Sequence, residues 1–201
     1  MNFLTIISVR AFSTCLLAFL LVAKTMFAAD WPIWGGNGSR NMVSFEKGIN
    51  LDFDPGRMDE DEVVDMKTTK NIKWIAKLGS QAYGNVTVAD GRVYAGTNNE
   101  SPRDPTKKGD RGIVMCFDEK TGKLNWQLVI PKLGAGKVSD WEYIGICSSP
   151  AIEGNRAYIV TNKCEVVCVD VEGLKNGNEG PFKSEAKYVN PKGQKAPLKE
   201  E

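Results

Sequence analysis

An all-β fold of antiparallel sheets is predicted by an internal repeat and by the strand and turn residues inside each copy. The segment NVTVADGRVYAGTN at residues 85–98 is echoed by SPAIEGNRAYIVTN at 149–162, and GIVMCFD at 112–118 is answered by EVVCVD at 165–170. Repetition at a period of several tens of residues is typical of repeat architectures. The fold of this chain of 201 residues is therefore expected to follow from copies of one unit.

The spacing of the two copies locates an insertion in the first one. Tyr94 matches Tyr158 at an offset of 64 residues, whereas Cys116 matches Cys168 at an offset of 52. The first copy therefore carries twelve extra residues, and they lie within residues 99–112. The Pro, Gly and charged residues of this stretch cannot sustain a strand, so we expect a protruding loop.

Each copy opens with two short β-forming stretches joined by a two-residue turn. Asp90-Gly91 joins them in the first copy and Gly154-Asn155 in the second. Both dipeptides tolerate positive φ, which a two-residue hairpin needs. We therefore expect an antiparallel hairpin at the start of each unit.

Two further strands complete the first unit. One is expected at 113–117, with its counterpart at 165–169 in the second copy. A turn then leads into a last strand at 124–130, and the offset of 52 aligns Trp126 in this strand with Trp74. A unit of about fifty residues with four antiparallel strands has the size and composition of one β-propeller blade.

These repeats resemble the quinoprotein-like, or PQQ-binding-like, family of β-propeller repeats. The pattern of that family is DG-x-VYxG, followed by a strand that closes on FD-x-x-TG-x-x-x-W. Here it stands as VADGRVYAGT and MCFDEKTGKLNW, and in a weaker form as SSPAIEGNRAYIVT and VVCVD, within residues 71–172. The opening WPIWGGNGSRNMVS at 31–44 also looks like the start of exported bacterial members. The resemblance implies antiparallel propeller blades of the quinoprotein alcohol dehydrogenase-like fold, incomplete in this chain.

Ten residues carry the repeat signature, and we expect their role to be structural. They are Trp74, Asp90, Gly91, Tyr94, Asp118, Gly122, Trp126, Gly154, Tyr158 and Asp170. Trp74 and Trp126 recur at the repeat period, which favours packing between blades over stacking on a cofactor.

The repeats divide the rest of the chain. Residues 71–126 form the first propeller repeat, and residues 127–172 form a second repeat that is incomplete because no TG-x-x-x-W follows Asp170. Residues 30–70 predict an irregular lead-in. Residues 173–201 are rich in Lys, Gly and Pro and predict a flexible polar tail.

One blade and part of another cannot close a ring, because propellers have about four to eight blades. We therefore expect the chain to be the N-terminal portion of a larger propeller. The alternatives are a degenerate gene fragment, or a small β protein that folds alone or pairs with another copy or with the missing blades.

Residues 1–29 predict a signal peptide. Arg10 and Lys24 bracket the thirteen residues AFSTCLLAFLLVA, a length that suits a secretory segment better than a membrane span of about twenty residues. Such a segment would direct export of the chain to the periplasm or the extracellular space, with a cut near Ala28 or Ala29. An uncleaved signal anchor is the alternative, and no other membrane span is expected.

Charge and composition exclude several kinds of function. The 26 basic and 25 acidic residues leave a net charge of +1, which supplies no field for binding nucleic acid. The chain has no histidine, so a Ser-His-Asp triad, a Cys-His nucleophile and a histidine-bearing zinc site are excluded. The acidic cluster at 59–65 lacks the ligand spacing of a calcium loop and predicts a solvated loop or helix start. We assign no catalytic residue and no metal ligand.

Export would place the cysteines in an oxidising compartment. Cys116 and Cys168 occupy one repeat position among apolar neighbours, and we expect both to be buried. Cys147 and Cys164 are the candidate disulfide, because one precedes the second hairpin and the other follows it closely.

Two functions remain. The first is an exported, non-catalytic propeller module that acts as a scaffold or interaction platform for an unidentified protein or small ligand. The second is part of a dehydrogenase in which a carboxylate base and a calcium-bound pyrroloquinoline quinone (PQQ) oxidise an alcohol or sugar. Both cofactors follow from the resemblance alone, and no position here matches the cofactor, calcium or base positions of the enzymes. We therefore favour the module.

Overall fold

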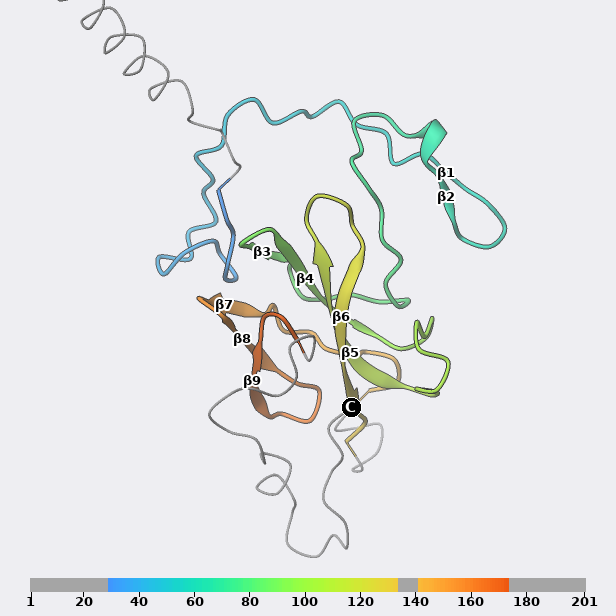
Figure 1. Ribbon diagram of the computed structural model, residues 1–201, viewed down its shortest axis with the longest axis vertical. Coiled ribbons are helices and arrows are strands. Elements are labelled where there is room, and N and C mark those ends of the chain that lie inside the picture. The colour runs from blue at the N-terminus through green and yellow to red at the C-terminus, as the bar shows by residue number, and fades with distance from the viewer. Residues whose placement is uncertain (1–28, 134–140, 174–201) are drawn as a thin grey trace, which may run out of the picture.

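The computed structural model describes residues 29–133 and 141–173. In this part of the chain the fold is all-β with antiparallel sheets, as predicted (Figure 1). Its one helical element is the single-turn 3-10 helix η1 (Met66–Thr68). The expected signal peptide and polar tail fall outside the described residues, apart from Ala29 and Gly173 at their edges.

The first unit forms a four-stranded sheet in the order β3-β4-β5-β6. Its strands are β3 (Thr87–Ala89), β4 (Arg92–Asn98), β5 (Arg111–Asp118) and β6 (Leu124–Pro131). The central strand β5 is apolar from Ile113 to Phe117, and these residues are buried on both faces. The inserted loop is two residues shorter than expected, because Arg111 and Gly112 already pair with Pro131 and Ile130 of β6.

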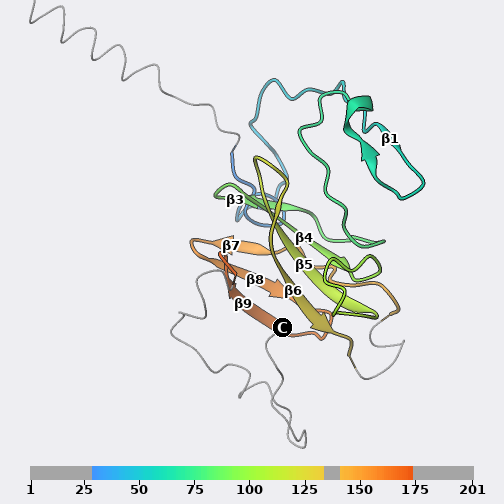
Figure 2. The same cartoon turned by 45° about the vertical axis from the view of Figure 1, so that its right-hand side comes forward.

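The second unit forms a three-stranded sheet in the order β7-β8-β9. Its strands are β7 (Ala151–Glu153), β8 (Arg156–Val160) and β9 (Val166–Asp170). It lies against one face of the four-stranded sheet, as the orange strands of Figures 1 and 2 show. The two sheets are open and do not close into a ring.

Both hairpins turn at the expected dipeptides, with different backbone conformations. In the first hairpin, Asp90 and Gly91 both have positive φ, at 49° and 73°. In the second, Gly154 has a φ of 56° and its neighbour Asn155 does not enter the positive region. The register is nevertheless the same, since Ala89 pairs with Arg92 as Glu153 pairs with Arg156.

The lead-in is more ordered than the prediction of an irregular segment. It holds a small hairpin of β1 (Arg57–Met58) and β2 (Val64–Asp65), which stands apart from the two sheets in Figure 1. The acidic cluster makes the turn of this hairpin, where the Asp59 carboxylate accepts hydrogen bonds from the backbone N–H groups of Asp61 and Val63.

The beginning of the lead-in joins the two sheets. Trp31 exchanges both backbone hydrogen bonds with Val88 of β3, at 2.7 and 3.0 Å. The carbonyl oxygen of the next residue, Pro32, accepts from the N–H of Ile152 in β7 at 2.7 Å. Residues 31–32 therefore connect the first strand of one sheet with the first strand of the other.

The core is divided between the two faces of the four-stranded sheet. Tyr94, Val114 and Cys116 point to the face that the three-stranded sheet covers. Met115 and Phe117 alternate with them and point to the opposite face. Residues 72–78 cover that opposite face through Ala76 and Leu78. No helix of the described residues is long and apolar enough to cross a membrane.

Candidate functional site

The junction between the two sheets is built around Trp126 of β6. Its indole Nε1 donates a hydrogen bond of 2.8 Å to the carbonyl oxygen of Val171, in the turn after β9. A Cβ on Gly173 would come within 2.7 Å of the indole ring, and this glycine has a φ of +65°. Glycine is therefore required there, both for the backbone conformation and for the close approach of the ring. The indole thus fixes the position of the three-stranded sheet.

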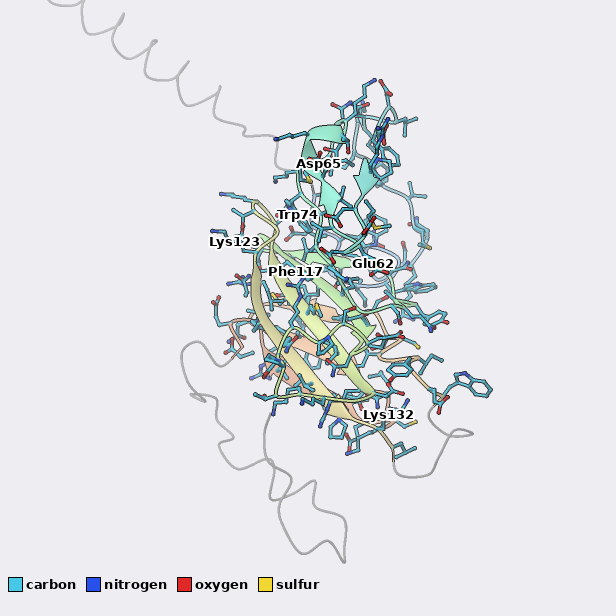
Figure 3. The ribbon with its side chains drawn as sticks, turned by 90° about the vertical axis from the view of Figure 1, so that its right-hand side faces the viewer. Glu62, Asp65, Trp74, Phe117, Lys123 and Lys132 are labelled. Atoms are coloured by element: carbon cyan, nitrogen blue, oxygen red, sulfur yellow. The ribbon has the colours of Figure 1, made fainter. Side chains whose placement is uncertain are left out.

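Trp74 repeats the same contact one unit earlier. Its Nε1 donates at 2.8 Å to the carbonyl oxygen of Glu119, in the turn after β5. A Cβ on Gly122, at φ +70°, would come within 2.5 Å of this indole. Figure 3 labels Trp74 together with Phe117, and the centroids of their rings lie 6.3 Å apart. Both repeats therefore make the same kind of contact, in which an indole N–H donates to a carbonyl oxygen of a turn and the ring packs on a glycine.

Tyr94 and Cys116 lie opposite one another on β4 and β5 and are fully buried at the junction. Burial raises the pKa of the Tyr94 hydroxyl well above its usual range, and it raises the pKa of the Cys116 thiol to about 11. Because the reactive form of cysteine is the thiolate, Cys116 is a packing residue and not a nucleophile near neutral pH.

The second sheet repeats this pair in the same register, with Tyr158 opposite Cys168. The expectation that Cys168 is buried is wrong, because it is exposed. Its repeat position is correct, but within the described residues no sheet covers it as the second sheet covers Cys116. We call the surface formed by Tyr158, Val160, Val166 and Cys168 the open face.

The acidic signature residues shape turns. Oδ1 of Asp118 accepts hydrogen bonds from the hydroxyl and the backbone N–H of Thr121, and these bonds lower the pKa of the carboxyl. Oδ1 of Asp170 accepts from the N–H of Glu172 in the corresponding turn. These carboxylates hold the two turns that receive the indoles, and this accounts for their place in the repeat.

An ion pair adds to the junction. The half-buried guanidinium of Arg92 on β4 contacts the Glu172 carboxylate in the turn after β9. The pair thus links the four-stranded sheet to the turn that also receives Trp126.

A second contact region, at the end of β4, was missed by the sequence analysis. Asn98 is fully buried, and its amide binds three separate segments. Oδ1 accepts from the N–H groups of Ser80 and Glu100, and Nδ2 donates to the Ser80 hydroxyl and the carbonyl oxygen of Tyr143. The neighbouring Thr97 accepts from the N–H of Gly79 at 2.9 Å. These contacts fix the segment before β3, at Gly79 and Ser80, and the segment before β7, at Tyr143, to the end of β4.

A signal for this region was present in the echo itself, because both repeated segments end in Thr-Asn. The second pair is Thr161 and Asn162, and Nδ2 of Asn162 donates to the carbonyl oxygen of Pro131 at 3.0 Å. The offset of 52 relates Pro131 to Gly79, so the two Thr-Asn pairs contact corresponding segments.

The candidate disulfide stays a prediction. Cys147 and Cys164 are both exposed on the second unit. The thiol of Cys147 lies 3.9 Å from the carbonyl oxygen of Ile144, and Cys164 takes a positive φ of 60° in the turn between β8 and β9.

Within the described residues, no three carboxylates or cysteines come together in a group that could bind a metal. A surface hollow of about 290 Å³ lies between Lys77, Leu78 and the loop residues 101–103. Its Arg103 donates to the Lys77 carbonyl oxygen and lies over the Phe117 ring, so this cation stabilises the loop.

Comparison with known proteins adds no assignment, since no family's sequence profile and no curated protein matches the chain. The identity of the repeats and the function therefore rest on the residues and contacts described above.

Proposed function

We propose that the two sheets are successive blades of a β-propeller and that the chain is an exported, non-catalytic PQQ-binding-like module that serves as an interaction platform. The observation that carries this proposal is the repeated indole contact. Trp74 and Trp126, separated by 52 residues, each donate to a carbonyl oxygen 45 residues further along the chain. Each ring also packs on a positive-φ glycine. A contact that recurs with the sequence repeat is what stacked blades require.

A non-catalytic role is supported by the environment of the polar groups. Asp118 and Asp170 are engaged in turns. Tyr94 and Cys116 are buried with raised pKa values, so they carry their protons at neutral pH. Asn98 is fully engaged in hydrogen bonds to other segments. These groups build the fold, and none is placed to act on a substrate.

A role in binding is supported by the open face. Val166 is 75% exposed, and Val160, on the neighbouring strand, is 50% exposed. Both belong to a sheet held in place by Trp126 and by residues 31–32. A contiguous apolar surface on a fixed sheet marks an interaction site in soluble proteins.

Calorimetric titration of the purified chain with PQQ and calcium tests the proposal against the dehydrogenase alternative. Circular dichroism first establishes a β-type spectrum, and a PQQ-dependent dehydrogenase serves as the positive control. We expect no saturable heat from the folded chain. Saturable binding of PQQ that depends on calcium would overturn the non-catalytic role and would call for an assay with an alcohol and a dye acceptor.

Export is tested separately by joining residues 1–29 to a reporter enzyme that is active only outside the cytoplasm. We expect reporter activity, and we expect it to be lost when Leu16 and Leu17 in the apolar stretch are both replaced by Arg, because charge there prevents insertion into the export machinery. Retention of the unmodified fusion in the cytoplasm would contradict the proposal.

A further inference from the structure

We propose that a second copy of this chain docks on the three-stranded sheet, with its residues 72–78 adding a fourth strand to β9 and its four-stranded sheet covering the open face. This inference rests on the proposed function, because both treat the two sheets as equivalent repeats. It adds the identity of the partner and the register of the contact.

The acceptor is the outer edge of β9. In the four-stranded sheet, β5 lies between β4 and β6. Its counterpart β9 pairs with β8 and, within residues 29–133 and 141–173, with no other strand. Among the described residues, the outer edge of β9 therefore has backbone N–H and C=O groups without a strand partner, and such an edge favours the addition of a strand.

The donor is the segment 72–78, which has the pattern of a strand without a strand partner. Its side chains alternate in exposure, with Trp74 and Ala76 half-buried and Ile75 and Lys77 exposed. This period of two is that of an extended β-strand. The backbone of residues 72–78 nevertheless makes no backbone–backbone hydrogen bond to any other described residue. The segment is thus packed on its own sheet through side chains. Its backbone forms no strand pair among the described residues, and the carbonyl oxygen of Lys77 accepts a hydrogen bond from the Arg103 side chain.

The repeat supplies the register of the new strand pair. On the offset of 52, residues 72–78 correspond to residues 124–130 of β6, which pair with β5. Cys116 lies opposite Trp126, so Cys168 should lie opposite Trp74 of the second copy. The same rule places Val166 of β9 opposite Ala76 of that copy.

This register also places opposite charges next to one another. Ile113 lies opposite Val129 in the existing sheet, and the offset of 52 converts this pair to Glu165 opposite Lys77 of the second copy. Opposite charges on directly paired residues stabilise an antiparallel sheet. In the single chain, Lys77 contacts Glu62 at 3.0 Å on an exposed surface, where such pairs exchange easily. Glu165 contacts Lys163 at 3.3 Å between half-buried side chains, and this pair must also exchange for the new pair to form.

The open face of the second sheet also corresponds to the face of the first sheet that is covered at the existing junction. At the existing junction, Val114 is fully buried beneath Ile159 and Ile146. Val166 takes the position of Val114 in the second sheet and is 75% exposed. The offset of 64 places Ala95 of the second copy where Ile159 lies at the existing junction. Ala95 is 5% exposed in the single chain, so the residues that cover it must move aside when the two faces meet. One head-to-tail contact therefore covers the open face and completes the sheet at the same time.

This contact joins two different surfaces and so repeats from copy to copy. Such a heterologous interface closes into a ring when the rotation between copies permits it, and otherwise grows into a filament. Each copy would contribute the fourth strand of its neighbour's second sheet.

Sedimentation velocity over a wide range of protein concentrations tests the association. We expect the wild-type chain to associate and the Val166→Asp variant to remain monomeric, because a charge at this position cannot be buried against a second sheet. Val43→Asp is the matched control. Val43 is 51% exposed in the lead-in, and its substitution should leave association unchanged. A wild-type chain that stays monomeric, or a Val166→Asp variant that associates normally, would overturn the proposal.

Disulfide trapping tests the register. Equal amounts of the Ala76→Cys and Val166→Cys variants are mixed and mildly oxidised. Directly opposite positions have Cβ atoms about 4.5 to 5.5 Å apart, close enough for a disulfide to form with a small adjustment. We expect a covalent dimer that contains one chain of each kind, in higher yield than from a control mixture of Lys47→Cys and Val166→Cys. Equal yields from the two mixtures would refute this register.

The two proposals fail in distinguishable ways. A folded chain that binds no PQQ and stays monomeric retains the proposed platform role and refutes self-association. A chain that associates through Val166 and also binds PQQ with calcium refutes the non-catalytic role and retains the interface.

Discussion

The two sheets are built from the same repeat and differ in what covers them. Val114 and Cys116 of the first sheet are fully buried, whereas Val166 and Cys168, at the same repeat positions, are exposed. The residues on the two faces are chemically alike, so their burial is decided by the neighbouring sheet. The sequence of each repeat unit thus supplies apolar residues for packing, and whether these residues are buried depends on the position of the unit in the array.

The two indoles, unlike these buried and exposed residues, make the same contact in both repeats. Trp126 docks on the turn of the second sheet and Trp74 docks on the turn of the first. The two contacts differ in the segment of chain that carries the indole. Trp126 belongs to a complete sheet, whereas Trp74 belongs to a segment whose backbone makes no sheet pairing.

The largest effect is expected from Trp126→Ala, which removes the indole between the two sheets. Loss of a packed aromatic ring and of its hydrogen bond to Val171 should reduce the free energy of unfolding by about 3 kcal/mol. Urea unfolding followed by circular dichroism measures this loss. Trp141→Ala is the control, because Trp141 is 67% exposed and its removal should change stability by less than about 0.5 kcal/mol. Equal effects of the two substitutions would show that the junction does not depend on the indole.

Asn98→Ala comes next, with an expected loss of about 2 kcal/mol. The substitution removes a buried amide and leaves its partners, including the N–H of Ser80 and the carbonyl oxygen of Tyr143, without these hydrogen bonds. Thermal and urea unfolding measure the loss, and Asn50→Ala on the exposed lead-in is the control. An Asn98→Ala variant as stable as the control would mean that water replaces the amide and that the three segments are held by other contacts.

The two hairpins should respond alike to alanine. Gly91 and Gly154 have φ values of +73° and +56°, with open space where a Cβ would stand. Each Gly→Ala change should therefore cost about 1 kcal/mol through backbone strain alone. Gly38→Ala, at a glycine without positive φ, should be neutral by the same unfolding assay. No loss at one of the two positions would show that its turn relaxes to another conformation.

The effect that is absent near neutral pH is a dependence of stability on pH that Cys116 contributes. Burial raises the pKa of Cys116 from 9.0 to about 11 in the folded chain. Between these values the unfolded chain has lost a proton that the folded chain still holds, so the free energy of unfolding should fall as pH rises from about 9 to about 11. Tyr94, with its raised pKa, adds to the same slope.

Unfolding midpoints measured across this pH range test the assignment. Cys116→Ala should flatten the slope, whereas Cys168→Ala, the matched change in the second sheet, should leave it unchanged. A slope that is the same in all three proteins would show that another group is responsible.

Local patterns predicted most of the strands. Asp90 and Gly91 predicted a turn, and the β-forming residues on either side of them predicted the two strands of a hairpin. These signals act over a few residues, so the all-β antiparallel architecture could be inferred without any knowledge of tertiary contacts.

The contacts between units could be predicted only in part. The period of the tryptophans indicated packing between repeats, but the exposure of Cys168 could not be read from a position it shares with Cys116. For Asn98, the Thr-Asn pair that ends both repeated segments was a signal, but the contacts with Ser80 and Tyr143 could not be read from it. Both depend on which segments meet in space, and that information is not local.

The bridge at residues 31–32 has a consequence for the order in which the chain folds. The hairpins β3–β4 and β8–β9 close over short loops, and such local contacts form early. Trp31 and Pro32 instead hydrogen-bond Val88 and Ile152, which are far along the sequence and belong to different sheets. This segment can settle only after both sheets exist and lie side by side, because closing such long loops costs entropy that no early contact offsets. The part of the lead-in that is synthesised first is therefore expected to be the last to reach its native place.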